Sequence, residues 1–135
     1  MAESRAAKLA RLVRVQRQME RMAENELAHT IGERAAVEDT RGALVDAVGS
    51  LHPVHRGMAA VYASRFGTLD QRERQLSSVQ VLQERRVLSE KTKADRLDKS
   101  ASKAAEAEER AASDESLLDL LDAAIAVRHS DESPA

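Results

Sequence analysis

Hydrophobic residues in the first part of the chain recur with the spacing of an α-helix. At about 100° per residue, eight of them fall within one stripe about 100° wide. These are Leu9, Leu12, Met19, Ala23, Leu27, Val37, Leu44 and Val48. Only Gly32 and Gly42 weaken the pattern, each at a cost of about 1 kcal/mol. We therefore expect a first helical arm over residues 3–48, which needs a partner helix because a helix owes most of its stability to tertiary packing.

The strongest break in this pattern lies at residues 49–53. Gly49 suits the end of a helix, and Pro53 suits the first turn of the next one. A second start signal follows at Thr68, with Gln71 at the spacing of a capping box. We expect a turn region over residues 49–67, although one long second helix from Pro53 satisfies the pattern equally well.

A second helical stripe follows over residues 54–112, with the alternating spacings of three and four that are typical of a coiled-coil seam. Its apolar members are Val54, Met58, Val61, Leu69, Leu76, Val79, Val87, Ala94, Leu97, Ala101 and Ala105. Its polar members are Arg65, Arg72, Gln83 and Glu90. Polar seam residues weaken packing but select register and oligomeric state. We therefore predict an all-α fold, an antiparallel two-helix coiled-coil hairpin over residues 1–129, that reverses either near residue 50 or near residue 58.

The most apolar segment of the chain lies beyond the second arm. Ser113 and Asp114 are suitable N-cap residues for a short third helix over residues 114–128. Its large apolar residues are Leu117, Leu118, Leu120, Leu121, Ile125 and Val127. Because the two arms are unequal, this segment extends past the paired part, and its apolar face must fold back, pair with a second copy or bind a partner. The polar tail, residues 130–135, is expected to be disordered.

The composition favours long helices over a compact catalytic domain. Ala, Leu, Glu, Arg and Lys supply 73 of 135 residues, whereas Tyr62 and Phe66 are the only aromatic residues and Cys is absent. A core of this size normally relies on several aromatic side chains. The sequence also contains no glycine-rich phosphate loop, nucleophile elbow or HExxH pattern. We expect no enzymatic activity, no catalytic residue and no cofactor.

Metal-binding and membrane-spanning patterns are also missing from the sequence. His52 and His55 flank Pro53, but a zinc site needs three or four ligands, so we expect solvated loop histidines and no metal. The longest apolar runs are far shorter than the roughly 20 residues that span a bilayer. With no apolar segment typical of a secretory signal, a cytoplasmic location is expected.

Charge is distributed unevenly, with +4 over residues 1–22 and −5 over residues 111–135, in a chain of net charge −2. A basic N-terminal segment also suits nucleic acid or an anionic membrane surface, but stacking aromatics are absent and the chain is acidic overall. Protein partners are therefore favoured over nucleic acid. The candidate partner-binding residues are Arg11, Arg14, Arg17, Arg21, Leu117, Leu118, Leu121 and Ile125.

The basic start at residues 8–15, KLARLVRV, and the charged stretch at residues 83–97, QERRVLSEKTKADRL, carry a family resemblance. Together with a turn in mid-chain, they resemble the flagellar export protein FliJ and the YscO-like stalk proteins of other type III secretion systems. The resemblance covers nearly the whole chain. It implies a cytoplasmic, non-enzymatic coiled-coil component of the bacterial flagellum or of type III secretion, peripheral to the membrane at most. Such a component serves protein transport and flagellum assembly as a stalk or adaptor between an export ATPase, chaperones and the export gate.

Two other functions stay open from the sequence. A generic cytosolic coiled-coil scaffold would form homo-oligomers through residues 117–127. A nucleic-acid or membrane-surface binder would act through the basic N-terminal segment. The sequence does not decide between a monomer and a dimer, or which residues contact a partner.

Overall fold

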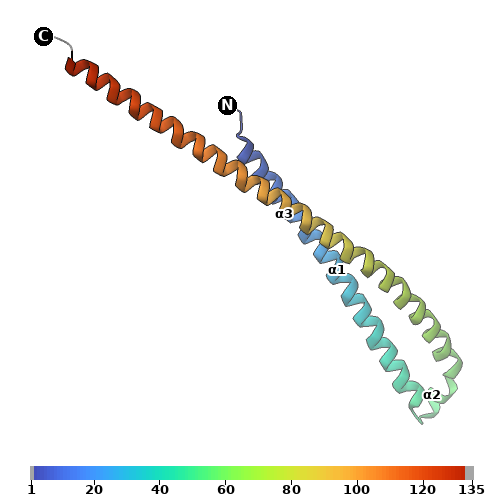
Figure 1. The fold of residues 1–135 in the computed structure, drawn as a ribbon. Helices are drawn as coiled ribbons and strands as arrows, with labels where there is room; N and C mark the ends of the chain where they lie inside the picture. The colour runs from blue at the N-terminus through green and yellow to red at the C-terminus, as the bar shows by residue number, and fades with distance from the viewer. Residues whose placement is uncertain (1, 133–135) are drawn as a thin grey trace. The chain divides into compact units, whose positions relative to one another are not determined.

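The computed structural model of this chain describes residues 2–132 and forms three α-helices, with no β-strand in that range (Figure 1). Helix α1 spans Arg5–Gly49, α2 spans Pro53–Gly57 and α3 spans Ala59–Glu132. The two long helices pack against each other, which confirms the expected all-α helical hairpin. The structure divides into two compact units, a central unit of residues 16–93 and a terminal unit that joins residues 2–15 to residues 94–132.

Local hydrogen bonds explain where the first two helices begin. The hydroxyl of Ser4 caps α1 by accepting a hydrogen bond from the backbone N–H of Ala7 at 3.1 Å. Helix α1 ends at Gly49. His52 then caps α2, its Nδ1 accepting from the N–H of Val54 at 3.3 Å, and Pro53 follows as the first helical residue. The break at residues 49–53 is therefore where the sequence predicts it.

The chain reverses between the two positions that the sequence allowed, residue 50 and residue 58. In the central unit, Arg34 pairs with Glu73 and Arg41 pairs with Asp70 across the two long helices. The positions midway between 34 and 73 and midway between 41 and 70 are 53.5 and 55.5, which coincide with α2.

The expected turn region of residues 49–67 is too long. The interruption between α1 and α3 covers residues 50–58, within which α2 forms a single short turn of helix. Thr68 does not start a helix, because its hydroxyl donates a hydrogen bond to the carbonyl of Ser64 inside α3 at 3.3 Å. The predicted capping box with Gln71 is therefore wrong, since tertiary packing continues the helix through Gly67.

Helix α3 also continues through the second predicted boundary, at Ser113 and Asp114. The expected separate helix at 114–128 is the end of α3, and the expected disordered tail is wrong for residues 130–132, while 133–135 lie outside the described residues. The sequence from 68 to 133 contains no glycine or proline. Ser and Asp inside a helix cost at most about 0.7 kcal/mol each, so neither residue ends it.

The seam of α3 follows the coiled-coil spacing without interruption, but its members differ from those expected. Covered positions in the central unit are Tyr62, Phe66, Leu69, Glu73, Leu76, Gln80, Gln83, Val87 and Glu90. Those in the terminal unit are Ala94, Leu97, Ala101 and Ala104. Seven expected members are exposed instead: Val54, Met58, Val61, Arg65, Arg72, Val79 and Ala105. The predicted stripe differs from the observed seam because it was defined by apolar residues, and the polar residues Glu73 and Gln80 occupy two of the seam positions.

In α1 too, polar residues occupy seam positions, and some apolar residues predicted to lie inside are exposed. Its covered positions in the central unit include Gln16, Glu20, Ala23, Leu27, Thr30, Arg34, Val37 and Leu44. Leu9 and Val13 hold seam positions in the terminal unit. Leu12, Met19 and Val48, which the apolar stripe placed inside, are 49%, 41% and 57% exposed. Polar residues therefore hold a large share of this interface, and few side chains among the described residues are fully covered.

Candidate protein-binding surfaces

The end of α3 in the terminal unit is the largest continuous exposed surface on one helix. Every residue from 105 to 132 is exposed. Six large apolar side chains in this stretch are between 53% and 67% exposed: Leu117, Leu118, Leu120, Leu121, Ile125 and Val127. Helix propensity places these residues on α3, and no described residue covers them.

The four predicted binding residues of this segment share one face of the helix. At about 100° per residue, Leu117, Leu121, Ile125 and Leu118 follow one another around an arc of about 100°. The carboxylates of Asp122, Glu115 and Asp119 come next around the helix. The segment is therefore an amphipathic helix with an exposed apolar face and an acidic border.

The two predicted arginines of the terminal unit are accessible to a partner. The guanidinium Nη1 of Arg11 lies 2.7 Å from Oε2 of Glu3, and its side chain is 57% exposed. Arg14 is exposed. An exposed ion pair contributes at most about 1 kcal/mol, so Arg11 can exchange Glu3 for another carboxylate at little cost.

The two predicted binding arginines of the central unit, Arg17 and Arg21, differ in how exposed they are. Nη2 of Arg21 donates to Oε1 of Gln18 at 2.7 Å, and the residue is exposed. Nη1 of Arg17 donates to Oε2 of Glu20 at 2.9 Å, and its side chain is only 32% exposed. Arg17 therefore borders the seam, where Glu20 is buried, and is less accessible to a partner than Arg21.

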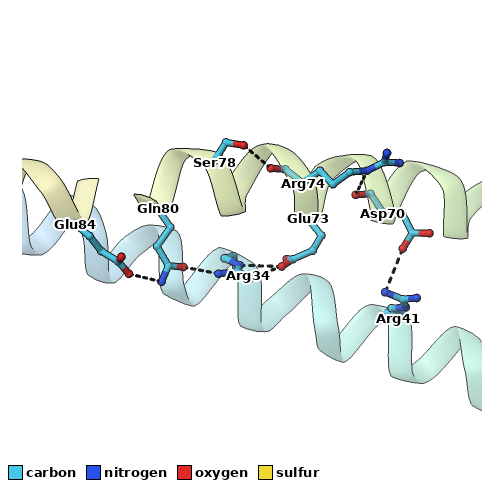
Figure 2. A network of polar contacts seen from close by, with 8 residues as sticks. All are labelled: Arg34, Arg41, Asp70, Glu73, Arg74, Ser78, Gln80 and Glu84. Carbon is cyan, nitrogen blue, oxygen red and sulfur yellow. Dashed lines mark hydrogen bonds and ion pairs between the residues drawn. The ribbon is translucent and has the colours of Figure 1, made fainter. Parts of the chain in front are cut away.

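A polar network across the central unit holds α1 against α3 (Figure 2). Nε of Arg34 donates to Oε1 of Glu73 at 3.0 Å, and Nη1 donates to Oε1 of Gln80 at 2.8 Å. The amide nitrogen of Gln80 then donates to Oε1 of Glu84 at 2.9 Å. The hydrogen bond from Arg34 lowers the pKa of Glu73, and the same bond raises the pKa of Arg34.

Three further interactions cross the same pair of helices. Nη2 of Arg72 lies 2.6 Å from Oε2 of Glu33, and Nη1 of Arg86 lies 3.0 Å from Oε2 of Glu26. In the third, the amide nitrogen of Gln16 donates to the carbonyl oxygen of Glu90 at 3.2 Å and also to its carboxylate. Of the four polar seam residues predicted for α3, only Gln83 and Glu90 are covered, and Glu73 and Gln80 were not predicted. A cross-helix pair can be identified only when the register of the two helices is known.

The histidines of the turn have structural partners rather than a metal-like arrangement. Nδ1 of His55 lies 2.7 Å from the hydroxyl of Tyr62, and His52 caps α2. His55 is half-buried beside an open hollow of about 380 Å³ that Phe66 also lines, so it is not the solvated loop residue that was expected. No group of three or more His, Cys, Asp or Glu side chains in residues 2–132 is arranged to hold a metal ion.

Comparison with known protein families, curated proteins and solved structures found no match to this chain. Within the described part of the chain, none of the helices has both the length and the apolar character needed to cross a membrane.

Proposed function

We propose that this chain acts by binding other proteins, as a non-enzymatic coiled-coil adaptor or stalk in the cytoplasm. The observation that supports this proposal is the exposed apolar face of α3 formed by Leu117, Leu118, Leu121 and Ile125, each more than half exposed. A row of large apolar side chains on one helix face is costly in water and is typical of a surface that docks another helix or a groove. A helical hairpin presents such a face on regular backbone, at defined spacing.

The setting that we propose is the type III export apparatus, where the partners are an export ATPase, chaperones and the export gate. The basis is the sequence resemblance carried by residues 8–15 and 83–97, together with the hairpin fold that the resemblance implied. In this setting, the apolar face of α3 and the exposed Arg11, Arg14 and Arg21 are the surfaces that contact partners.

Affinity capture of a purified type III export ATPase by the tagged full-length chain tests this proposal. We expect the chain to retain the ATPase, and the double variant Leu118→Asp with Leu121→Asp to lower the retained amount at least tenfold. Both substitutions lie on exposed positions, so circular dichroism of the variant should match the parent chain. Failure of the parent chain to retain the ATPase would exclude the export setting.

The same exposed face also supports a second candidate, a self-associating scaffold. Two copies would bury their apolar faces against each other through residues 117–127. Sedimentation velocity over a hundredfold range of concentration separates the two functions. A dimer that forms with increasing concentration and disappears in Leu118→Asp would support the scaffold, whereas a monomer throughout would support the adaptor.

A further inference from the structure

The seam of α3 in the terminal unit continues in register beyond the last residue that α1 covers. Ala94 is buried, and Leu97, Ala101 and Ala104 follow at the alternating spacing with partial burial. The next seam position is Glu108, whose Oε1 accepts a hydrogen bond from the backbone N–H of Ala6 at 3.0 Å. Continued without a change of spacing, the seam then runs through Ala111, Glu115, Leu118, Asp122 and Ile125.

Each acidic seam residue of α3 that faces α1 receives a donor from that helix. Arg34 donates to Glu73, and Gln16 donates to Glu90. Near the start of α1, the N–H of Ala6 donates to Glu108. A carboxylate at a helix–helix seam loses water when the partner helix docks, so it needs a cationic or amide donor there to avoid the cost of desolvation.

Glu115 and Asp122 are the next two acidic seam residues, seven residues apart, and both are exposed. Between and beside them lie the apolar seam residues Ala111, Leu118 and Ile125. A helix that covers this seam therefore needs apolar side chains and, between them, two hydrogen-bond donors seven residues apart.

We propose that the end of α3 receives one basic amphipathic helix of a partner protein, seated in continuation of the α1–α3 seam. Apolar side chains of that helix cover Ala111, Leu118 and Ile125. Two of its Arg or Gln side chains, seven residues apart, pair with Glu115 and Asp122. The inference rests on the proposed function as a protein-binding adaptor, and it adds the chemistry and register of the bound helix.

The charge of the segment argues against a second copy of itself as the occupant. Residues 111–135 carry six carboxylates and Arg128, a net charge of −5. Two such segments placed together repel each other, whereas a basic helix gains complementary charge at Glu115 and Asp122.

The test uses the full-length chain and two synthetic 18-residue helical peptides. The first places Leu opposite the apolar seam residues and Arg at the two positions opposite Glu115 and Asp122. The second is identical except that Glu replaces both Arg residues. We expect fluorescence anisotropy to show that the Arg peptide binds about tenfold more tightly than the Glu peptide, since two favourable charge pairs become two unfavourable ones.

Charge reversal in the chain should invert this preference. In the variant Glu115→Lys with Asp122→Lys, the Glu peptide is expected to bind more tightly than the Arg peptide. The matched control is Glu106→Lys with Glu109→Lys, which changes the net charge equally but lies outside the seam register on the same exposed helix. This control should keep the preference for the Arg peptide, although the added positive charge slightly weakens binding of the Arg peptide and slightly strengthens binding of the Glu peptide.

A second pair of variants tests the apolar contacts. Leu118→Asp with Ile125→Asp removes the large apolar seam residues and should weaken binding of the Arg peptide at least tenfold. Leu120→Asp with Val127→Asp is the control, because these residues are 67% and 62% exposed but lie off the seam. Circular dichroism should be the same for both variants.

Equal binding of the two peptides, or equal losses in the seam and control variants, would overturn the proposed register and partner chemistry. So would a dimer of the parent chain that Leu118→Asp with Ile125→Asp abolishes, because a second copy would then cover the face. These outcomes are distinct from failure of the proposed function. An export ATPase retained equally by the parent and the seam variant would leave the adaptor function intact and exclude only this binding face.

Discussion

Gln80 and Gln83 lie three residues apart in the seam of α3, and their amide groups have opposite surroundings. Gln80 accepts a hydrogen bond from Arg34 at 2.8 Å and donates one to Glu84 at 2.9 Å. Oε1 of Gln83 is buried and has no hydrogen-bond partner among the described residues. A buried, unpaired amide oxygen costs about 1–3 kcal/mol, so the same residue type stabilises one layer of the hairpin and destabilises another.

We predict that Gln83→Leu raises the free energy of unfolding by about 1 kcal/mol, because it removes an unpaired polar atom from the seam. Gln80→Leu should lower it by about 1–3 kcal/mol, because the substitution deprives Arg34 and Glu84 of their partner. Urea unfolding followed by circular dichroism measures both. A loss of stability in Gln83→Leu would show that its amide is hydrogen-bonded in solution.

The sequence predicted helix boundaries and seam positions correctly where they depend on the properties of one residue alone. Helix α1 ends at Gly49 and Pro53 begins α2 as its fixed φ favours, and Gln83 and Glu90 lie in the seam as the spacing indicated. The positions of Glu73 and Arg34 were missed because each is acceptable in a seam only when it faces the other. Knowledge of the partner helix was required to find them.

At the scale of the helices, two local N-cap signals did not start a new helix. Thr68 and Ser113 both have the chemistry of N-cap residues, yet α3 passes through each of them. Gly67 also lies inside α3, with a backbone φ that is not positive and no neighbouring atom within 4 Å of the place where a Cβ would be. The helix continues through Gly67 and Thr68 because these weak positions cost less than the seam contacts on either side contribute. It continues through Ser113, where every neighbouring residue is exposed, because no glycine or proline interrupts its helix propensity.

Gly67→Ala is therefore predicted to stabilise the chain by about 0.5–1 kcal/mol, since alanine restricts the unfolded chain and meets no obstacle in the helix. Thermal unfolding should show a higher midpoint for Gly67→Ala and a lower one for Gly67→Pro, which removes a helical hydrogen bond. If the alanine variant were less stable than the parent, α3 would have to begin after residue 67, as the capping-box signal suggested.

At the scale of the whole molecule, the two units differ in how much of their helix surface has a partner. In the central unit, both long helices contribute seam residues along their length. In the terminal unit, α3 continues for more than twenty residues beyond Glu108 with every residue exposed. A helix with no tertiary contacts is only marginally stable in water, so we expect the proposed partner helix to increase the order of this end.

Hydrogen–deuterium exchange measured by mass spectrometry tests this difference. Backbone amides of residues 109–132 should exchange at least tenfold faster than those of residues 16–48, because no tertiary contact opposes local opening. Addition of the basic peptide described above should slow exchange in this segment alone. Strong protection in the free chain would mean that the segment is covered by a fold-back or by a second copy.

The sequence by itself determined the features that depend on local preference: two long helices, a break at residues 49–53 and an apolar face through Leu118, Leu121 and Ile125. It did so because helix propensity, Gly and Pro effects and apolar spacing act within a few residues of each other. Only the tertiary structure decided which residues form the seam, where the chain reverses and that α3 continues through Gly67 and Thr68. Those outcomes depend on which side chains meet across the two helices, and a half-buried Glu73 is favourable only opposite a donor such as Arg34.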